Sequence, residues 1–317
     1  MGYRCYLRLM NRPRLIVTGI GQASLDYIAV VDGYPAEDTK QEAQSLVVAG
    51  GGPVATALVG LSRLKVKAFL MGVVAPDEAG KAIIKGLEDE GVDVSGVKVR
   101  KVGESQRAFI VVNRKDGTRT IVWKRPTARP LLARELDRAR ISGADMLILD
   151  GLMSEASLKA ASIARKAGVP VLLDAGRVRE GMMEIAALSD YVVGSAEFAA
   201  GLDLSPQEAV ERLSALGCRA ATITSGREGS VTFCEGRLIV QKAFDVDALD
   251  TTGAGDVFHG GYAYGVLMGW TIDETLEFAS AFAAIKCMSI GGRRGIPTLA
   301  RTMRFIREKG ECRRKGR

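Results

Sequence analysis

The amino-acid sequence predicts an α/β fold with a mainly parallel central sheet and helices on both faces. Short apolar runs in the middle of the chain occur at residues 146–149, 171–173 and 191–193. Helical stretches separate them at residues 155–167 and 180–188. Continuous apolar strands that alternate with helices are typical of a parallel sheet that is buried on both faces. Ligands bind at the carboxyl ends of such strands, where the sequence places Asp150, Asp174 and Gly194.

The first predicted strand covers residues 15–21, and residues 25–31 continue as a second strand. Gly19-Ile20-Gly21 could open a dinucleotide-binding fingerprint, but Ser24 occupies the place of the third glycine. The fingerprint also requires a helix after the glycines, where this chain predicts a strand. A nucleotide-dependent oxidoreductase is therefore a disfavoured alternative.

Four short strands lie outside the alternation of strands and helices. Residues 25–48 contain two of them around a Tyr34-Pro35 turn. Residues 106–113 and 118–124 form the other two around Asp116-Gly117, a strong hairpin signal. We therefore expect a second, smaller sheet that projects from the main domain.

The remaining elements complete the alternation. Gly50-Gly51-Gly52-Pro53 predicts a turn into a helix with proline in its first turn. A strand at 68–71 and an amphipathic helix at 78–90, which ends at Gly91, follow it. A strand at 221–224 leads through a Gly226 turn into another strand, and helices are expected at 257–268 and 272–288.

The most informative stretch of the chain is Asp250-Thr251-Thr252-Gly253-Ala254-Gly255-Asp256. Its small residues let backbone N–H groups face a ligand at the start of the following helix, where the helix dipole favours an anion. Asp256, in the first turn, can then take a proton from a hydroxyl group that attacks phosphorus. The alternative is an ordinary capped helix, with Asp250 or Thr252 as the N-cap residue.

This stretch resembles the signature of the ribokinase-like carbohydrate kinases, the PfkB family. Residues 49–57, Ala-Gly-Gly-Gly-Pro-Val-Ala-Thr-Ala, resemble the second signature of that family, a Gly-Gly run that opens an early helix. The resemblance extends from Ile16 to about Arg307. It implies a ribokinase-like three-layer sandwich over residues 14–310, with lid strands at about 25–48 and 106–125 that close over the sugar.

The resemblance implies an ATP-dependent kinase that uses Mg²⁺ and phosphorylates a hydroxymethyl group on a sugar or sugar-derived acid. The sequence is most similar to the ketose side of the family, which includes ketohexokinase and sulfofructose kinase. A nucleoside or 2-keto-3-deoxygluconate kinase is the alternative within the family. A non-catalytic sugar or nucleotide sensor is the alternative outside it, although a sensor has no need of a base at Asp256.

The resemblance also assigns roles to individual residues. Asp256 is the expected base, beside an anion hole formed by Gly253, Ala254 and Gly255. The expected sugar contacts are Asp26, Gly50, Gly51, Thr56, Asn113 and Asp256, and the expected ATP contacts are Thr224, Gly226, Gly229, Gly253 and Gly255. Glu197 is expected to hold Mg²⁺ through water, and Asp250 and Thr252 are expected to help enclose a monovalent cation such as K⁺. The Asn-x-x-Glu element of the family has Gly194 in the place of Asn, so either Ser195 substitutes for it or the metal is organised differently.

The net charge of the chain indicates which ligands and partners to expect. The net charge is +7, and much of it lies in basic tails at residues 1–13 and 311–317. Such tails are usually solvated, so the charge suits ATP, and nucleic acid is not an expected partner. Lys124 and Arg125, at the end of a predicted lid strand, could pair with an anionic group of the substrate. Exposed apolar lid strands would permit a homodimer.

Cysteine and histidine usage exclude other kinds of site. The five cysteines are far apart in the sequence, which indicates reduced thiols in a cytoplasmic protein. His259 is the only histidine, which excludes multi-histidine metal sites, and we expect it to be hydrogen-bonded near the active-site floor. No targeting or membrane segment is predicted, and Met10 is a candidate for the natural first residue.

Overall fold

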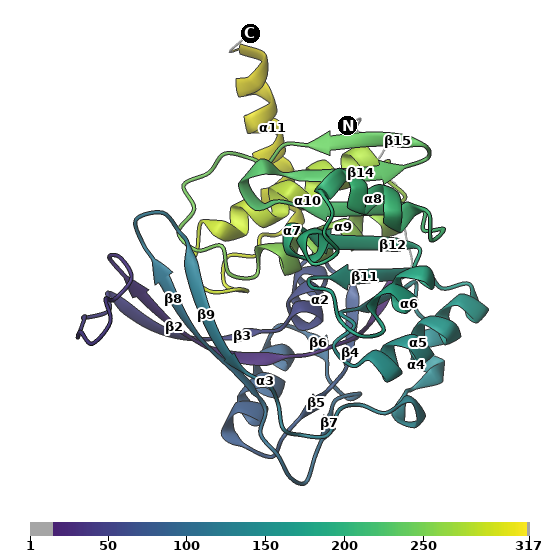
Figure 1. Ribbon diagram of the computed structural model, residues 1–317, viewed down its shortest axis with the longest axis horizontal. Coiled ribbons are helices and arrows are strands. Elements are labelled where there is room, and N and C mark those ends of the chain that lie inside the picture. Colours follow the sequence, from purple (N-terminus) through teal and green to yellow (C-terminus); the bar gives the residue numbers. More distant parts are fainter. Residues whose placement is uncertain (1–14, 316–317) are drawn as a thin grey trace.

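The computed structural model describes residues 15–315 of the 317-residue chain, with side chains as far as Lys309. Figure 1 shows a large sheet flanked by helices and a smaller sheet that projects to one side. The predicted tail at residues 1–13 lies outside the described residues, and helix α11 (Leu299–Lys315) runs into the second predicted tail. No helix within residues 15–315 is long and apolar enough to cross a membrane.

The large sheet contains nine of the described strands, in the order β15-β14-β13-β12-β11-β10-β1-β4-β6. All neighbours from β13 to β6 are parallel, and β14 and β15 form an antiparallel edge. The prediction of a mainly parallel sheet is confirmed. The strands are β1 (Ile16–Ile20), β4 (Lys67–Met71), β6 (Val92–Asp93), β10 (Met146–Leu149), β11 (Val171–Ala175), β12 (Tyr191–Ser195), β13 (Ala220–Thr224), β14 (Ser230–Cys234) and β15 (Arg237–Gln241).

Helices cover both faces of this sheet because alternate residues of its central strands point to opposite sides. Val17 and Ile148 pack with α2, α9 and α10, whereas Ile20 and Leu149 pack with α5, α6 and α8. The helices are α2 (Pro53–Arg63), α3 (Glu78–Asp89), α4 (Arg138–Ser142), α5 (Ser154–Ala167), α6 (Met182–Ala187), α7 (Ala196–Ala200), α8 (Pro206–Ser214), α9 (Ala254–Leu267) and α10 (Ile272–Cys287), with 3₁₀ turns η1 (Ala133–Glu135) and η2 (Gly226–Glu228).

The small sheet, which we call the lid, has the strand order β3-β2-β8-β9. Its strands are β2 (Ser24–Val31), β3 (Ser45–Gly51), β8 (Gln106–Asn113) and β9 (Arg119–Lys124), while β5 (Val73–Val74) and β7 (Lys98–Val99) pair separately. The two predicted strand pairs are joined through a parallel pairing of β2 with β8. β1 is followed by the strand β2 and not by a helix, which confirms that the turn between them has no dinucleotide fingerprint.

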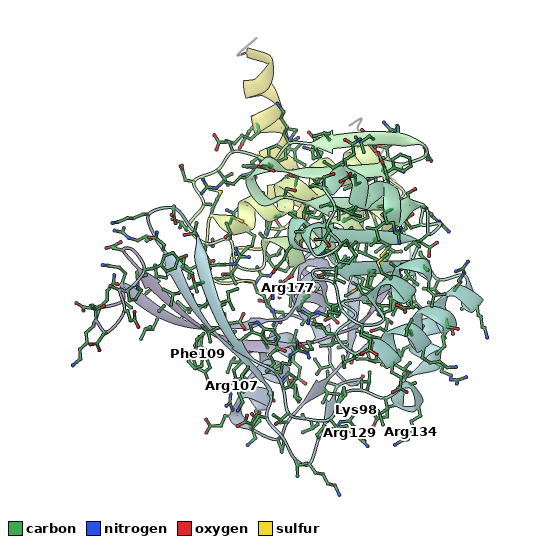
Figure 2. The ribbon with its side chains drawn as sticks, in the orientation of Figure 1. Lys98, Arg107, Phe109, Arg129, Arg134 and Arg177 are labelled. Atoms are coloured by element: carbon green, nitrogen blue, oxygen red, sulfur yellow. The ribbon has the colours of Figure 1, made fainter. Side chains whose placement is uncertain are left out.

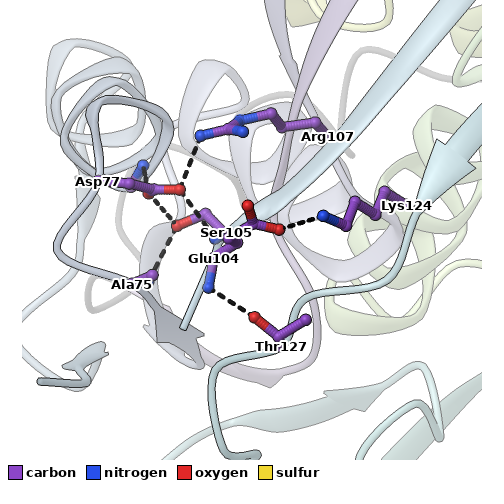
Figure 3. A network of polar contacts seen from close by, with 8 residues as sticks. Ala75, Asp77, Glu104, Ser105, Arg107, Lys124 and Thr127 are labelled. Carbon is purple, nitrogen blue, oxygen red and sulfur yellow. Dashed lines mark hydrogen bonds and ion pairs between the residues drawn. The ribbon is translucent and has the colours of Figure 1, made fainter. Parts of the chain in front are cut away.

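A polar network anchors the base of the lid to the large domain (Figure 3). Asp77, the N-cap residue of α3, accepts hydrogen bonds from the Ser105 hydroxyl at 2.7 Å and from Arg107 Nη2 at 2.8 Å. Lys124, at the end of β9, pairs with Glu104. Lys124 therefore has an acidic partner just before β8, and its pairing with an anionic substrate stays a prediction.

Candidate active site

The start of α9 is built for close approach of a ligand. Gly253 is its N-cap residue, with a left-handed φ of 72°. A Cβ atom there would lie 3.0 Å from the Gly292 Cα atom, so both the angle and the space favour glycine. A Cβ atom at Gly255 would meet no atom within 4 Å, because this side of the helix faces open space. Asp256 follows it in the first turn and is half-buried.

The amide groups at this helix end differ from one another. The N–H groups of a first helical turn have no partner within the helix. The Ala254 N–H nevertheless donates to Thr251 O at 3.2 Å, and the Val257 N–H donates to Gly253 O at 2.9 Å. The Ala254 amide of the predicted anion hole is therefore engaged in the loop, whereas Gly255 and Asp256 lie between these two and present theirs at the open end.

The surroundings of Asp256 make it a stronger base than an exposed aspartate. Burial, followed by repulsion from Asp174, raises the pKa of Asp256 to about 6, while attraction to His259 opposes the rise. Asp26, on the lid, adds a smaller repulsion. A carboxylate with this pKa is ionised at pH 7 and accepts a proton more readily than usual.

His259 lies under Asp256 as a buried, hydrogen-bonded residue, as predicted. Its Nδ1 is 2.7 Å from Gly255 O, and its Nε2 is 3.0 Å from Val193 O. Both partners are acceptors, so both ring nitrogens donate only when the ring is protonated. Burial opposes the charged ring, but Asp174, 3.5 Å from Nε2, and the two carbonyls outweigh it and raise the pKa of His259.

Asp150 and Asp174 end adjacent strands of the large sheet and complete an acidic floor. Asp150 accepts hydrogen bonds from Gln22 N at 2.8 Å and Leu152 N at 3.0 Å. Burial raises the pKa of Asp150 to about 7 against these two bonds, and Asp174 and Asp256 contribute further repulsion. Both acids stand at the carboxyl ends of parallel strands, where ligands of such sheets bind.

The sugar side of the site gathers four of the predicted residues around a buried arginine. Ser24 Oγ donates to the Asp26 carboxylate at 2.7 Å. A Cβ atom at Gly51 would lie 2.1 Å from Asp26 Oδ2, so glycine leaves room for this carboxylate. Arg293 Nη2 donates to Gly51 O at 2.5 Å, and its Nε donates to Thr56 Oγ1 at 3.3 Å.

Gly50 makes room for the same arginine. A Cβ atom at Gly50 would lie 2.2 Å from Arg293 Nη1. Burial raises the pKa of Asp26, and the Ser24 bond and the charge of Arg293 limit that rise. Asp26, Gly50, Gly51 and Thr56 are thus brought together around Arg293, whose charge favours the ionised form of Asp26.

The predicted nucleotide loop follows β13. Thr224 Oγ1 donates to Gly194 O at 3.2 Å and joins the ends of β13 and β12. Gly226 has a φ of +56°, and a Cβ atom there would meet no atom within 4 Å, so its backbone is open to a ligand. Gly229, with a φ of +100°, is required for space, because a Cβ atom would lie 2.0 Å from Gln241 O.

The tip of the lid hairpin reaches this loop. Arg227 Nη2, in η2, donates to Asp116 O at 2.8 Å. Thr251 Oγ1, in the loop before α9, donates to Gly117 O at 3.2 Å and accepts from Arg119 Nη1 at 2.7 Å. The lid therefore contacts both loops that would receive phosphate groups.

Glu197 presents an exposed carboxylate at the start of α7, 2.8 Å from Arg177 Nη2. Ser195 caps the same helix by accepting from Phe198 N at 3.1 Å, and it donates to Gly176 O at 2.8 Å. Ser195 is therefore committed to the backbone. The described residues contain no group of three or more His, Cys, Asp or Glu that could hold a metal ion.

The loop predicted to enclose a monovalent cation contains a lysine side chain instead. Lys286 Nζ donates to Asp250 O at 2.9 Å and also to Thr252 O. The buried Asp250 carboxylate accepts from Thr252 N and Gly291 N, both at 2.7 Å. Both carbonyls that were expected to face a monovalent cation therefore already accept from an ammonium group.

Residues 16–299 match the pfkB family carbohydrate kinases. The chain belongs to this family. A 5-dehydro-2-deoxygluconokinase from Clostridium botulinum is 28% identical to this PfkB kinase, over 96% of this chain and 97% of the relative. An ATP-dependent ribose-1-phosphate kinase from Halopiger xanaduensis is 29% identical, over 92% and 98%. A crystal structure from Agrobacterium tumefaciens, described as a candidate ribokinase, has a TM-score of 0.87 at 26% identity and covers 94% of this chain and 99% of its own. The predicted ribokinase-like fold and the predicted kinase class are confirmed.

One predicted sugar contact of this PfkB kinase lies apart from the others. The lid register pairs Asp26 with Ala108, and Asn113 lies five residues further along β8, which is roughly 17 Å at the rise of a β-strand. The Asn113 Oδ1 atom accepts from Lys115 N at 3.2 Å within the hairpin turn. The structure therefore places Asn113 at the lid tip and not beside Asp26.

Three cationic residues of the site were not predicted. Arg293 and Lys286 are almost fully buried, and Arg119 reaches the loop before α9 from the lid. Lys286 has a signal in the sequence, because it is a charged residue that directly follows the apolar residues Ala283-Ala284-Ile285 of a helix. Arg293 directly follows a Gly-Gly pair, but its partners Gly51 and Thr56 are more than 200 residues away in the chain.

Proposed function

We propose that this PfkB kinase transfers the γ-phosphoryl group of ATP to a hydroxymethyl group of a sugar or sugar-derived acid. The observation that carries the proposal is the half-buried Asp256 in the first turn of α9, at the open helix start formed by Gly253 and Gly255. The hydroxyl oxygen forms a bond to the γ-phosphorus as the bond to ADP breaks, and Asp256 takes the hydroxyl proton. The Gly255 amide and the helix dipole stabilise the charge on the transferring group.

ATP and Mg²⁺ are the proposed cofactors. The name of the Halopiger relative, an ATP-dependent kinase, supports ATP as the donor. The Gly226 turn and the side chains of Arg227 and Arg119 line the route of its phosphates. Mg²⁺ would neutralise the phosphate oxygens, and the exposed carboxylate of Glu197 can hold one of its water molecules.

Three arginines favour a substrate that carries a negative charge. Burial, and then repulsion from Arg125 and Arg177, lower the pKa of Arg179, while Asp150 and Glu197 oppose this. The charges of Arg125 and Arg177 therefore both act on Arg179. Figure 2 shows Arg177 near the middle of the molecule, between the lid and the large sheet. A carboxylate or phosphate on the sugar would relieve their mutual repulsion.

A cavity of about 200 Å³ lies beside this cluster. Arg125 and Trp123, from the end of the lid, line it together with Gln22 and Leu152, whose N–H groups both donate to Asp150. It therefore lies between Arg125 and the two residues whose N–H groups hold Asp150. The two curated relatives named above act on a sugar acid and a sugar phosphate, which supports the same substrate class.

A panel of sugars in a coupled ADP-release assay tests the function. It includes a neutral ketose, which the sequence signatures favour, ribose, a nucleoside, 2-keto-3-deoxygluconate, 5-dehydro-2-deoxygluconate and ribose 1-phosphate. We expect turnover with a sugar that presents a free hydroxymethyl group, and a higher kcat/KM for the anionic members. Absence of ADP release with every sugar would remove the kinase assignment and leave a sensor.

The variant Arg179→Gln separates the anionic substrates from the neutral ones. A charge-assisted hydrogen bond contributes about 1.5–3 kcal/mol, so KM for the preferred anionic sugar should rise by roughly 10- to 100-fold while KM for a neutral ketose stays the same. Arg165→Gln is the matched control, because Arg165 lies on α5 and contacts Ala187 O at 3.3 Å. Equal effects of Arg179→Gln on both kinds of sugar would exclude the arginine cluster as the anion site.

We also propose that two copies pair through the outer face of the lid. Val48, Tyr27, Phe109 and Val122 form one row across the four strands, and Val48, Phe109 and Val122 are 59%, 60% and 67% exposed. Rows of exposed apolar residues on a sheet mark interaction surfaces. Sedimentation velocity should show a dimer, and Phe109→Lys should yield a monomer. A wild-type monomer at all concentrations would contradict the proposal.

A further inference from the structure

Lys286 is a buried cation at the loop that leads into α9. It occupies the last turn of α10, and its side chain is 0% exposed. Its ammonium group donates to Asp250 O at 2.9 Å and to Thr252 O. A buried charge is costly unless it is paired and hydrogen-bonded, so a position of this kind requires a specific balance of charges.

Asp250 provides that balance. Burial lowers the pKa of Lys286, and the Asp250 carboxylate is the strongest influence that opposes this. The same carboxylate accepts from Thr252 N and Gly291 N, so it ties the loop before α9 to the loop after α10. The ammonium and the carboxylate together fix the backbone of residues 250–252 from both sides.

This loop sets the position of the catalytic helix end. The N-cap residue Gly253 directly follows Thr252, and the Ala254 N–H donates back to Thr251 O. Movement of the two carbonyls held by Lys286 would therefore move the Gly255 amide and Asp256. The ammonium also adds a fixed positive charge at the helix end where negative charge develops during phosphoryl transfer.

Backbone carbonyls of this kind can also hold a bare monovalent cation. An ammonium group carries the same single charge and satisfies the same oxygens through N–H donors. We propose that Lys286 takes the place of a monovalent cation in this kinase, so that its loop and its activity are independent of K⁺. The activity part of this inference rests on the proposed function, whereas the loop part does not.

The Thr252 hydroxyl group suggests the alternative that K⁺ binds beside Lys286. Thr252 Oγ1 is buried and has no hydrogen-bond partner among the described residues. A cation bound beside Lys286 could use this oxygen. In that case K⁺ would still activate the wild-type enzyme, which makes the wild-type enzyme the first test.

The test compares the full-length wild-type enzyme in K⁺ and in tetramethylammonium chloride at equal ionic strength. We expect equal kcat values and equal melting temperatures in the two salts. Severalfold activation by K⁺, or a rise in melting temperature specific to K⁺, would overturn the proposal. The melting measurement needs no sugar, so it remains decisive even if no substrate of the panel is phosphorylated.

Two substitutions extend the test. Lys286→Ala leaves space that K⁺ can enter, and we expect kcat to fall by about 10²-fold without K⁺ and to recover in part with it, together with a K⁺-dependent rise in melting temperature. Lys286→Met fills the space without a charge, so K⁺ should restore neither quantity. Lys85→Met is the control, because Lys85 is an exposed lysine paired with Asp89 on α3. A folded Lys286→Ala variant with full activity in both salts would overturn the proposal. If neither variant folds, the wild-type comparison decides.

Discussion

Replacing Asp256 with asparagine is expected to lower kcat by about 10²- to 10⁴-fold, because the amide cannot accept the proton of the attacking hydroxyl group. The amide has nearly the same shape as the carboxylate, and Asp256 is only half-buried, so the fold should persist. The measurement is ADP release with the best sugar of the panel, with the melting temperature recorded in parallel. Asp273→Asn, which removes an exposed ion pair with Arg237, serves as the matched control. Near-normal kcat in the Asp256 variant would exclude this residue as the base.

The same variant should change the pH profile. The carboxyl of Asp256 has a pKa of about 6, so in the wild-type enzyme it binds a proton as the pH falls below that value. A protonated carboxyl cannot act as the base, so kcat/KM should decrease on the acid side of about pH 6 and reach a plateau above it. Asp150, Asp174 and His259 interact electrostatically with Asp256, so the decrease in kcat/KM at acid pH reports the titration of this whole group of residues. In Asp256→Asn the part of this decrease that Asp256 contributes should be lost from the residual activity.

Replacing Arg293 with methionine is expected to reduce the free energy of unfolding by about 2–5 kcal/mol, because it leaves two buried acceptors without their donor at about 1–3 kcal/mol each and removes a charge that favours ionised Asp26. Arg293 is 5% exposed and Asp26 is also 5% exposed, so water cannot replace the lost charge at either position. The variant also removes the donors to Gly51 O and Thr56 Oγ1. Urea unfolding, followed by fluorescence, measures the change.

The control for Arg293 is a second arginine-to-methionine change at a solvated pair. Arg237 and Asp273 lie 2.6 Å apart with side chains 52% and 54% exposed, so Arg237→Met should change the free energy of unfolding by less than about 1 kcal/mol. Equal effects of the two substitutions would show that Arg293 does not balance a buried charge. In the folded fraction of Arg293→Met, the sugar KM should also rise, since Arg293 positions Gly51 beside Asp26.

The local signals in the sequence predicted most of the elements that position the site. The Asp116-Gly117 hairpin, the proline at the start of α2 and the glycine-rich start of α9 all lie where the sequence places them. Each depends on residues that are neighbours in the chain, such as the φ of 72° at Gly253 that glycine adopts readily. Such conformations follow from local chemistry and need no knowledge of the fold.

The contacts that complete the site depend on the fold and could not be predicted in this way. The parallel pairing of β2 with β8 joins two hairpins that are about eighty residues apart, and its register removes Asn113 from the sugar side. Arg293 meets Gly51 across 242 residues of sequence. Lys286 looks like an interruption of an apolar helix until the loop that contains Asp250 is placed against it. Burial of a charge is a property of the assembled domain.

The contacts of the lid tip connect the predicted sugar site with the predicted nucleotide site. Asp116 and Gly117 are bonded to Arg227 and Thr251, which belong to the loops proposed to receive the nucleotide. The sugar compartment cannot open to solvent by a swing of the hairpin without first releasing those loops. We therefore expect departure of the phosphorylated sugar and release of ADP to be coupled through movement of the lid hairpin.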